Sequence, residues 1–306
     1  MVADRLIFLE GIPDTSTLKD LPIYYKPQYL RLIQPNVKGF YALLPNRRDI
    51  VMLLYFQCIE NEAISLQEAP FGGIYFTQLA ENRQINDFLQ FISLQLSTIG
   101  ITRLSIKIAP RCYGPSALPL DTIGMSSTKR EINHHLPITS KSLTDQMTQM
   151  QRRRLKKGMA ANFVFVQEAP DQLNKIYTFI QACRAQKKHA ISVSLTKLKA
   201  LSDALPSRYL MFSCYHQGQL IAATICVMVN DRVLYNFLPA SLKTYNTYSP
   251  MVFLLNKIYE YGQQHYFEVL DLGTSMLDDK PNEKLITFKN RMGGVQTERS
   301  IYSREI

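Results

Sequence analysis

Cysteine is scarce in this chain of 306 residues, and the usual metal-binding spacings of cysteine and histidine are missing. There are five cysteines, an odd number, and several lie within apolar runs, such as Cys214 and Cys226. An odd number of thiols in apolar surroundings indicates buried cysteines in a reducing compartment, not a disulfide framework. Neither a Cys-x-x-Cys nor a His-Glu-x-x-His spacing occurs, so we expect no metal site.

Long hydrophobic runs are also missing. No apolar stretch approaches the roughly 18 to 20 residues that a membrane-spanning helix needs. Residues 1–10 have too short an apolar stretch and the wrong charges for a signal peptide. The hydrophobic content of 46% is nevertheless enough to fill the cores of two domains. We therefore expect a soluble, cytoplasmic protein with two lobes.

Acidic residues are outnumbered by basic ones, 25 against 35, which gives a formal net charge of +10. Such an excess favours an anionic partner, whether nucleotide phosphates, nucleic acid, an acidic carrier protein or a membrane surface. The basic residues are spread along the chain, apart from the run QRRRLKK at 151–157. This run has no interleaved aromatic residues, unlike a single-strand binding site. It can be a binding surface or simply a solvated helix face.

The second half of the chain has a clear order of secondary-structure elements. Apolar residues at helical spacing, alternating runs and turn residues define each element in turn, and Ser249 followed by Pro250 is typical of a helix start. The predicted order is helix 143–158, strand 162–167, helices 170–183 and 195–205, strands 209–216, 220–229 and 233–238, helix 249–265, a strand ending at 271, a short helix, and strand 295–302.

The first half has a fainter but similar rhythm. Its predicted elements are strand 6–9, helix 26–33, strands 39–44, 50–58 and 64–67, a glycine turn at 71–75, helix 85–96 and strand 103–108. The segment 133–142, which contains His134 and His135, has no apolar periodicity and is predicted to be the linker between the lobes. We therefore predict an N-terminal lobe at 1–138 and a C-terminal lobe at 139–306.

The last forty residues carry the most informative motif. A strand ending in Asp271 and Gly273 is followed by a polar loop and by a short helix that carries Phe288 and Lys289 into a glycine pair. This strand, loop, helix and final strand resemble the end of the acyltransferase domains of the Fem-type branch of the GNAT superfamily. That branch includes peptidyltransferases that add amino acids to peptidoglycan precursors.

The resemblance implies a fold and an architecture. The element order of the second half matches that of a GNAT domain, and Tyr24-Tyr25-Lys26 and the turn at 70–73 resemble the first lobe of Fem-type proteins. The expected fold class is α/β, with mixed sheets in two tandem GNAT-like lobes. In a GNAT domain the middle strands splay at a bulge that binds the donor's pantetheine arm, and the next helix N-terminus holds the pyrophosphate.

By this resemblance the donor lies between strand 233–238 and the helix that starts at Ser249. Asn236 can point into the cleft or only satisfy a bulge, and Tyr245 can line an acyl tunnel or belong to a packed surface turn. The candidate donor-binding residues are Asn236, Phe237, Leu238, Tyr245 and Ser249.

The loop before this helix departs from the pattern of acetyl-CoA-dependent members. Those members carry a Gln/Arg-x-x-Gly-x-Gly/Ala loop, whose glycines let backbone amides approach phosphate closely. This chain has TYNTYSPM at 244–251, and no glycine between Gly218 and Gly262. We therefore rank a carrier-bound or tRNA-bound donor above free acetyl-CoA.

Fem-type members use aminoacyl-tRNA, and the related long-chain N-acyl amino acid synthases use an acyl carrier protein. Both donors are large anions, which fits the net charge of +10. The long helical hairpin that Fem peptidyltransferases usually carry in the second lobe is missing, which counts against tRNA. Arg152 and Arg153 are candidate substrate-binding residues. We expect acyl-CoA, acyl carrier protein or aminoacyl-tRNA as co-substrate and no tightly bound cofactor.

Acyl transfer to an amine needs the amine close to the carbonyl, a group that polarises the carbonyl, and a proton acceptor. Asp271 is a candidate base, or only caps the following loop. Lys289 is a candidate anion holder, or lies on a solvated helix face. The Tyr248 phenol is a candidate acid, and Ser275 is a candidate substrate contact. No Gly-x-Ser-x-Gly elbow supports a Ser-His-Asp mechanism.

Two functions from different classes therefore remain open. The first is an N-acyltransferase or aminoacyltransferase that moves an acyl group from a thioester or aminoacyl-tRNA to an amine on a small molecule or peptide. The alternative is a catalytically inactive GNAT-fold module that binds an acidic carrier, a nucleotide or a nucleic acid. RNA binding through the helix at 152–157 is a third and weaker hypothesis.

Overall fold

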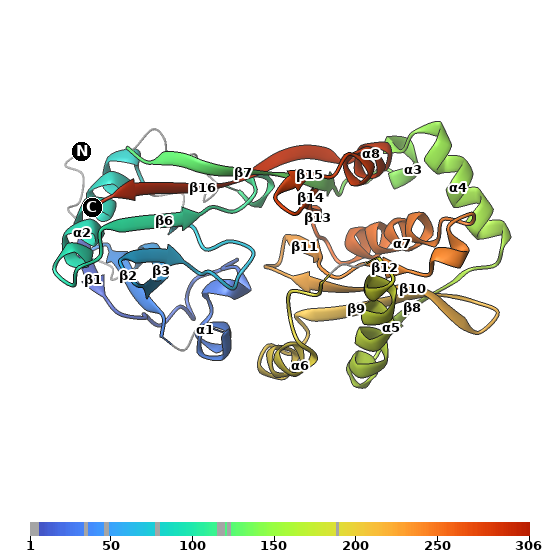
Figure 1. Cartoon of the computed structure of the whole chain (residues 1–306), viewed down its shortest axis with the longest axis horizontal. Coiled ribbons are helices and arrows are strands. Elements are labelled where there is room, and N and C mark those ends of the chain that lie inside the picture. Colours follow the sequence, from blue (N-terminus) through green and yellow to red (C-terminus); the bar gives the residue numbers. More distant parts are fainter. Residues whose placement is uncertain are drawn as a thin grey trace. The chain divides into compact units, whose positions relative to one another are not determined.

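The computed structural model describes residues 6–33, 36–45, 49–76, 80–114, 120, 124–187 and 190–306. The chain divides into two compact units: unit 1 comprises Met1–Ile132 and Thr297–Ile306, and unit 2 comprises Asn133–Gln296. The chain passes from unit 1 to unit 2 within strand β7 (Ser126–Pro137) and returns within β16 (Val295–Glu305) (Figure 1). Within the described ranges, no helix is long and apolar enough to span a membrane.

The sheet of unit 1 has the strand order β1-β2-β3-β4-β6-β16-β7. β4 and β6 run parallel, whereas β1–β2, β2–β3, β3–β4 and β6–β16 are antiparallel. β3 reads as a continuous apolar run because most of its residues are buried. The remaining bounds are β1 (Ile7–Glu10), β2 (Lys38–Leu43), β3 (Ile50–Ile59), β4 (Glu62–Ser65), β5 (Tyr75–Phe76) and β6 (Arg103–Lys107). The short strand β5 pairs with β3.

Two α-helices, α1 (Pro27–Ile33) and α2 (Asn82–Ser97), accompany this sheet. α2 begins with a capping box, in which the Glu81 amide donates to Oε1 of Gln84 at 2.8 Å. Its buried residues recur at helical spacing and join the strand residues in one apolar core. The same spacing predicts a helix over 85–96, and the structure confirms it.

The glycine turn at 71–75 is needed for close packing. The Gly72 amide donates to the carbonyl oxygen of Lys107 at 2.8 Å, and a Cβ at Gly72 would lie 2.3 Å from Cβ of Leu66. The Tyr25 hydroxyl donates to the carbonyl oxygen of Gly73 at 2.7 Å. The turn therefore anchors the 3-10 helix Ile23–Tyr25 to the core of unit 1.

We expect Gly72→Ala to lower the free energy of unfolding by about 1 to 3 kcal/mol, because the added methyl has no space beside Leu66. Urea denaturation measures this. Gly158→Ala is the control, since its Cβ would lie 3.2 Å from the nearest ring atom of Phe163 and alanine favours a helix. Equal losses in the two variants would contradict the packing argument.

The sheet of unit 2 has the strand order β7-β13-β11-β10-β9-β8. β11 and β13 run parallel and the other neighbours are antiparallel. The bounds are β8 (Val164–Glu168), β9 (Tyr209–His216), β10 (Gln219–Met228), β11 (Val233–Asn236), β12 (Ala240–Ser241) and β13 (Val269–Thr274). The short strand β12 pairs with β10. A separate hairpin is formed by β14 (Met276–Leu277) and β15 (Lys280–Pro281).

Helices cover both faces of this sheet (Figure 1). The apolar side chains of α5 and α6 form one core with β9 and β10, and those of α3, α4 and α7 form another. The bounds are α3 (Leu143–Gln146), α4 (Gln149–Ala160), α5 (Leu173–Ala185), α6 (Leu195–Ala204), α7 (Pro250–Gln264) and α8 (Glu283–Arg291). The predicted α/β fold class and the element order of the second half are confirmed.

Two local predictions are wrong. The chain does not form one helix over 143–158, because α3 ends at Gln146 and α4 begins at Gln149. Between them the Thr148 amide donates to the carbonyl oxygen of Arg291 at 2.9 Å, which keeps this segment extended. His134 and His135 are not in an irregular linker either, because they lie in β7, where His135 pairs with Asp271 of β13.

Candidate active site

The candidate site lies where β11 and β13 diverge. The two strands pair from Val233 and Val269 as far as Tyr235 and Asp271. Beyond that point the amides of Phe237 and Leu238 both donate to one carbonyl of β10, that of Ile225, at 3.1 Å. The regular pairing of β11 with β13 ends at this bulge. Ligands in open α/β sheets bind at the C-terminal ends of strands that separate in this way.

Asp271, on β13, shapes the turn that follows the strand. Its side chain is buried, and Oδ1 accepts hydrogen bonds from Nδ2 of Asn133 at 2.9 Å and from the Gly273 amide at 2.8 Å. Gly273 has a φ of +73°, and a Cβ there would lie 3.1 Å from the Tyr235 ring. The carboxylate therefore holds a tight turn in which glycine is required.

Lys289 reaches this turn from α8 and is only 4% exposed. Its Nζ donates to the carbonyl oxygens of Gly273 at 2.7 Å and Thr274 at 2.9 Å. Burial lowers the pKa of Lys289 to about 7, although the nearby charge of Asp271 opposes this shift. Among the described residues these two carbonyls are its hydrogen-bond partners, so an ammonium has a third N–H that these two bonds do not use.

Both ends of α8 have defined caps. The helix starts at Asn282, whose Oδ1 accepts from the Leu285 amide at 3.2 Å. It ends at a glycine pair: the Gly294 amide donates to the carbonyl oxygen of Lys289 at 2.9 Å, and Gly293 has a φ of +92°. Gly293 lies against α3, because a Cβ there would be 2.6 Å from Cβ of Gln146.

A second hydrogen-bonded group adjoins Lys289. Ser275 and His134 are fully buried, and the Ser275 hydroxyl lies 2.9 Å from Nδ1 of His134. The other ring nitrogen, Nε2, lies 3.1 Å from Oδ1 of Asn290. Burial, together with the charge of Lys289, lowers the pKa of His134 to about 4. The imidazole is therefore neutral at physiological pH.

A third group surrounds the N-terminus of α7. Ser249, with a φ of +52°, precedes Pro250 at the first helical position. The Tyr245 hydroxyl donates to Oε1 of Gln219 at 3.0 Å. Nζ of Lys157, from α4, lies 4.9 Å from the ring centre of Tyr248, which is 38% exposed. The basic helix α4 therefore lies beside the N-terminus of α7, which has no side-chain cap among the described residues.

Residues 145–281 match the family model of the acetyltransferase (GNAT) domain. Unit 2 therefore contains a GNAT domain. The match covers the diverging strands and α7, and it ends before α8, so Lys289 and Asn290 lie beyond it, while Asn133 and His134 precede it. Among curated proteins, none has a sequence that matches this chain.

Solved structures share the fold of the whole chain. The chain resembles FemX with a TM-score of 0.68 at 10% identity, covering 92% of this chain and 91% of FemX. It resembles L-PGS from Bacillus licheniformis with a TM-score of 0.61 at 12% identity, covering 94% of this chain and 93% of L-PGS. A tandem GNAT protein from the clavulanic acid biosynthesis pathway gives 0.54 at 11% identity, with 98% of both chains covered. The Fem-like, tandem GNAT fold expected from the sequence is thus confirmed.

The structure brings together only some of the predicted site residues. Asp271, Ser275 and Lys289 gather around the turn after β13, whereas Tyr245, Tyr248 and Ser249 form the separate group at α7. Asn236 is buried and accepts a hydrogen bond from the Thr224 hydroxyl at 2.7 Å. Its amide oxygen therefore forms a hydrogen bond between two neighbouring strands of the sheet, β10 and β11.

The remaining predicted residues are placed as follows. Leu238 belongs to the apolar core beneath α5, and Phe237 is half-buried beside it. Arg152 and Arg153 are exposed on α4, with Nη1 of Arg152 3.4 Å from the carbonyl oxygen of Thr144. These two residues lie on the surface of the GNAT domain and not in the cluster around Lys289.

Sequence reasoning missed Asn133, His134 and Asn290. Asn133 and His134 stand in a polar stretch that looks like a linker, and they gain partners only when β7 pairs with β13. The one available signal was the position of Asn290 directly after Lys289 in the α8 motif. A neighbour of a functional residue on a short helix is a reasonable candidate for a supporting role.

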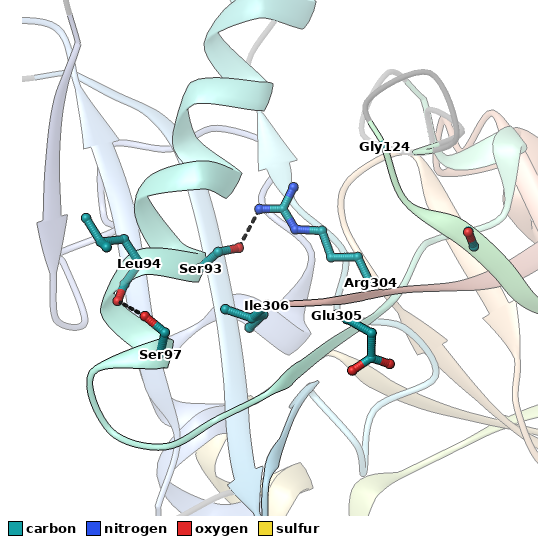
Figure 2. Close-up of a pocket in the computed structure, with 8 residues that line it drawn as sticks. Ser93, Leu94, Ser97, Gly124, Arg304, Glu305 and Ile306 are labelled. Carbon is teal, nitrogen blue, oxygen red and sulfur yellow. Dashed lines mark hydrogen bonds between the residues drawn. The ribbon is translucent and has the colours of Figure 1, made fainter.

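A pocket in unit 1 is a weaker candidate (Figure 2). It lies beside α2 and the last residues of β16, and Arg304 and Glu305 are the charged residues that line it. The Arg304 guanidinium donates to the carbonyl oxygen of Leu89 at 2.8 Å and to the Ser93 hydroxyl. Among the described residues that line it there is no histidine or cysteine, and the Glu305 carboxylate is exposed and lies 3.9 Å from Nε of Arg103.

Proposed function

We propose that this protein is an N-acyltransferase that moves an acyl or aminoacyl group from a thioester or an aminoacyl-tRNA to an amine. The GNAT domain supports acyl transfer in general. The observation that carries the finer proposal is the buried ammonium of Lys289 at the point where β11 and β13 diverge. A buried cation with an unused N–H is suited to charge that develops during a reaction.

The proposed reaction is direct transfer. The acceptor amine attacks the donor carbonyl, a C–N bond forms, and the carbonyl oxygen becomes an oxyanion that the third N–H of Lys289 stabilises. The C–S bond of a thioester, or the C–O bond of an aminoacyl ester, then breaks. The amine loses its proton to water, and the leaving thiolate or alkoxide takes up a proton. Asp271 supports this step by holding the turn whose carbonyls orient Lys289.

Charge on α4 supports a large anionic donor. The helix carries five exposed basic side chains and no acidic one within its described span: Arg152, Arg153, Arg154, Lys156 and Lys157. Lys157 stands beside Tyr248, next to the N-terminus of α7, where a helix favours phosphate. Donor phosphates at this end would leave the acyl carbonyl to extend between β11 and β13 toward Lys289.

A donor screen tests the proposal. Purified protein would be heated with acetyl-CoA, a long-chain acyl-CoA, an acyl carrier protein or aminoacyl-tRNA. We expect one donor class to raise the unfolding midpoint by roughly 5 °C at a hundredfold excess over its Kd. The same donor should acylate an amine from a panel of amino acids and peptides, with Lys289→Met as the inactive control.

The screen also separates the alternatives. A tRNA donor would bind with a steep salt dependence, whereas that of acyl-CoA would be shallow, because fewer phosphates are contacted. Stabilisation by a carrier, nucleotide or RNA without any amine acylation would overturn the transferase proposal in favour of a binding module. Acylation that Lys289→Met leaves at the wild-type rate would refute the proposed site.

A further inference from the structure

We propose that His134 is a positioning residue for Lys289, because it ties the turn after β13 to helix α8 and so fixes the direction of the ammonium. This inference rests on the proposed function. His134 is fully buried and comes from β7, a different element from both groups that it joins.

The hydrogen bonds define the state of the ring. Oδ1 of Asn290 is an acceptor, so Nε2 of His134 carries the proton and donates at 3.1 Å. Nδ1 is then bare and accepts the Ser275 hydroxyl at 2.9 Å. Both ring nitrogens are thus used, one toward the turn and one toward the helix. We call these two hydrogen bonds of His134 the bridge. Burial disfavours the imidazolium, so the bridge keeps this form throughout the physiological pH range.

The bridge closes a ring of contacts around the ammonium. Lys289 donates to the carbonyl of Thr274 at 2.9 Å, and Ser275 is the next residue in the chain. Ser275 contacts His134, which contacts Asn290, the residue that follows Lys289 on α8. A shift of the turn relative to α8 would break this ring. His134 therefore sets the separation between the carbonyl acceptor and Nζ.

A nucleophilic serine is a poorer reading of the same contacts. The pairing of the Ser275 hydroxyl with a bare imidazole nitrogen resembles an activated serine. However, a nucleophile must reach the donor carbonyl, and Ser275 is 0% exposed. The ring contacts explain the burial of both residues without any covalent intermediate.

Conservative variants test the bridge. His134→Leu fills the space but removes both hydrogen bonds, and we expect kcat to fall about tenfold or more with KM changed less than twofold. His134→Asn keeps an acceptor close to the Nδ1 position and should restore most of kcat, because the turn stays tied. His134→Gln keeps only a donor close to the Nε2 position and should restore less.

A pH profile gives a readout that loss of packing alone would not move. If Lys289 acts as a cation, the rate falls as the pH rises through its pKa. Three other titratable groups face this region: Asp271, His135 and His134 itself. In His134→Leu the leucine side chain still keeps water out, but it no longer holds Ser275. The neighbouring Thr274 carbonyl can then move away from Nζ of Lys289, so the ammonium loses an acceptor. The alkaline midpoint of His134→Leu should therefore lie about half to one pH unit lower than that of the wild type.

Ser275→Ala keeps the test decisive if His134→Leu does not fold. This small change breaks the same bridge, so it should reproduce both the loss of kcat and the lower alkaline midpoint. The double variant should be no worse than either single variant, since both remove one bridge. Folded variants with wild-type kcat and an unmoved midpoint would overturn the positioning role.

Failure of this inference is distinguishable from failure of the proposed function. If Lys289→Met abolishes transfer while the His134 variants behave as wild type, the active site stands and the bridge does not. If Lys289→Met transfers at the wild-type rate, the proposed function of the site is wrong, and the positioning role is overturned with it.

Discussion

Replacing Lys289 with methionine should lower the rate of acyl transfer by about 100- to 1000-fold, the usual cost of removing one oxyanion donor. Methionine matches the length of the lysine stem but cannot donate a hydrogen bond. The loss should appear in kcat more than in KM, because the oxyanion exists only in the transition state. Single-turnover kinetics with the donor found by the screen measure it.

The same variant should remain folded. Removing the buried amine favours the folded state, because no amine has to be desolvated on folding. It also disfavours the folded state, because the carbonyls of Gly273 and Thr274 lose this donor. We expect these effects largely to offset each other, with a change of less than about 2 kcal/mol in the free energy of unfolding. Lys284→Met, exposed on the same helix, is the matched control and should retain full activity. Equal activity of the two variants would refute the assignment.

The direction of the pH dependence identifies the form of Lys289 that acts. Its pKa is lowered to about 7, so the ammonium is present below that pH and is lost above it. An oxyanion-stabilising cation gives a rate that falls as the pH rises through about 7, whereas a neutral lysine acting as a base gives a rate that rises. In Lys289→Arg the guanidinium stays charged, so the alkaline limb should vanish from the remaining activity.

Asp271→Ala should be the most destabilising single change in the site, with a loss of about 3 kcal/mol in the free energy of unfolding. The carboxylate is 3% exposed and accepts from Nδ2 of Asn133 and from the Gly273 amide. Alanine would leave both donors buried without this acceptor. The turn that presents its carbonyls to Lys289 would also loosen, so transfer should fall along with stability.

Asp271→Asn separates the two effects. The amide keeps an acceptor oxygen, so we expect a loss of only about 1 kcal/mol. It removes the negative charge that raises the pKa of Lys289, so the alkaline limb of the rate should move to lower pH. Chemical denaturation and a pH–rate profile measure the two quantities. An alanine variant as stable as the asparagine variant would contradict the structural role of the carboxylate.

The sequence predicted the local order of elements because each element has its own pattern. The apolar spacing of α2 and the alternating runs of β9 and β10 depend on residues within one turn or one strand. The prediction failed where a distant segment decides the conformation. Thr148 interrupts the expected helix because its amide pairs with Arg291, which lies far away in the sequence.

By itself, the sequence determined the fold class and the short motif that joins Asp271, Ser275 and Lys289, since these residues lie within one strand, turn and helix. Only the tertiary structure decided that Lys289 is buried, that Asn236 faces Thr224, and that His134 meets Ser275. The physical reason is that His134 and Ser275 are 141 residues apart. Burial and hydrogen-bond partners are set by which strands pair, and no local pattern of residues records that choice.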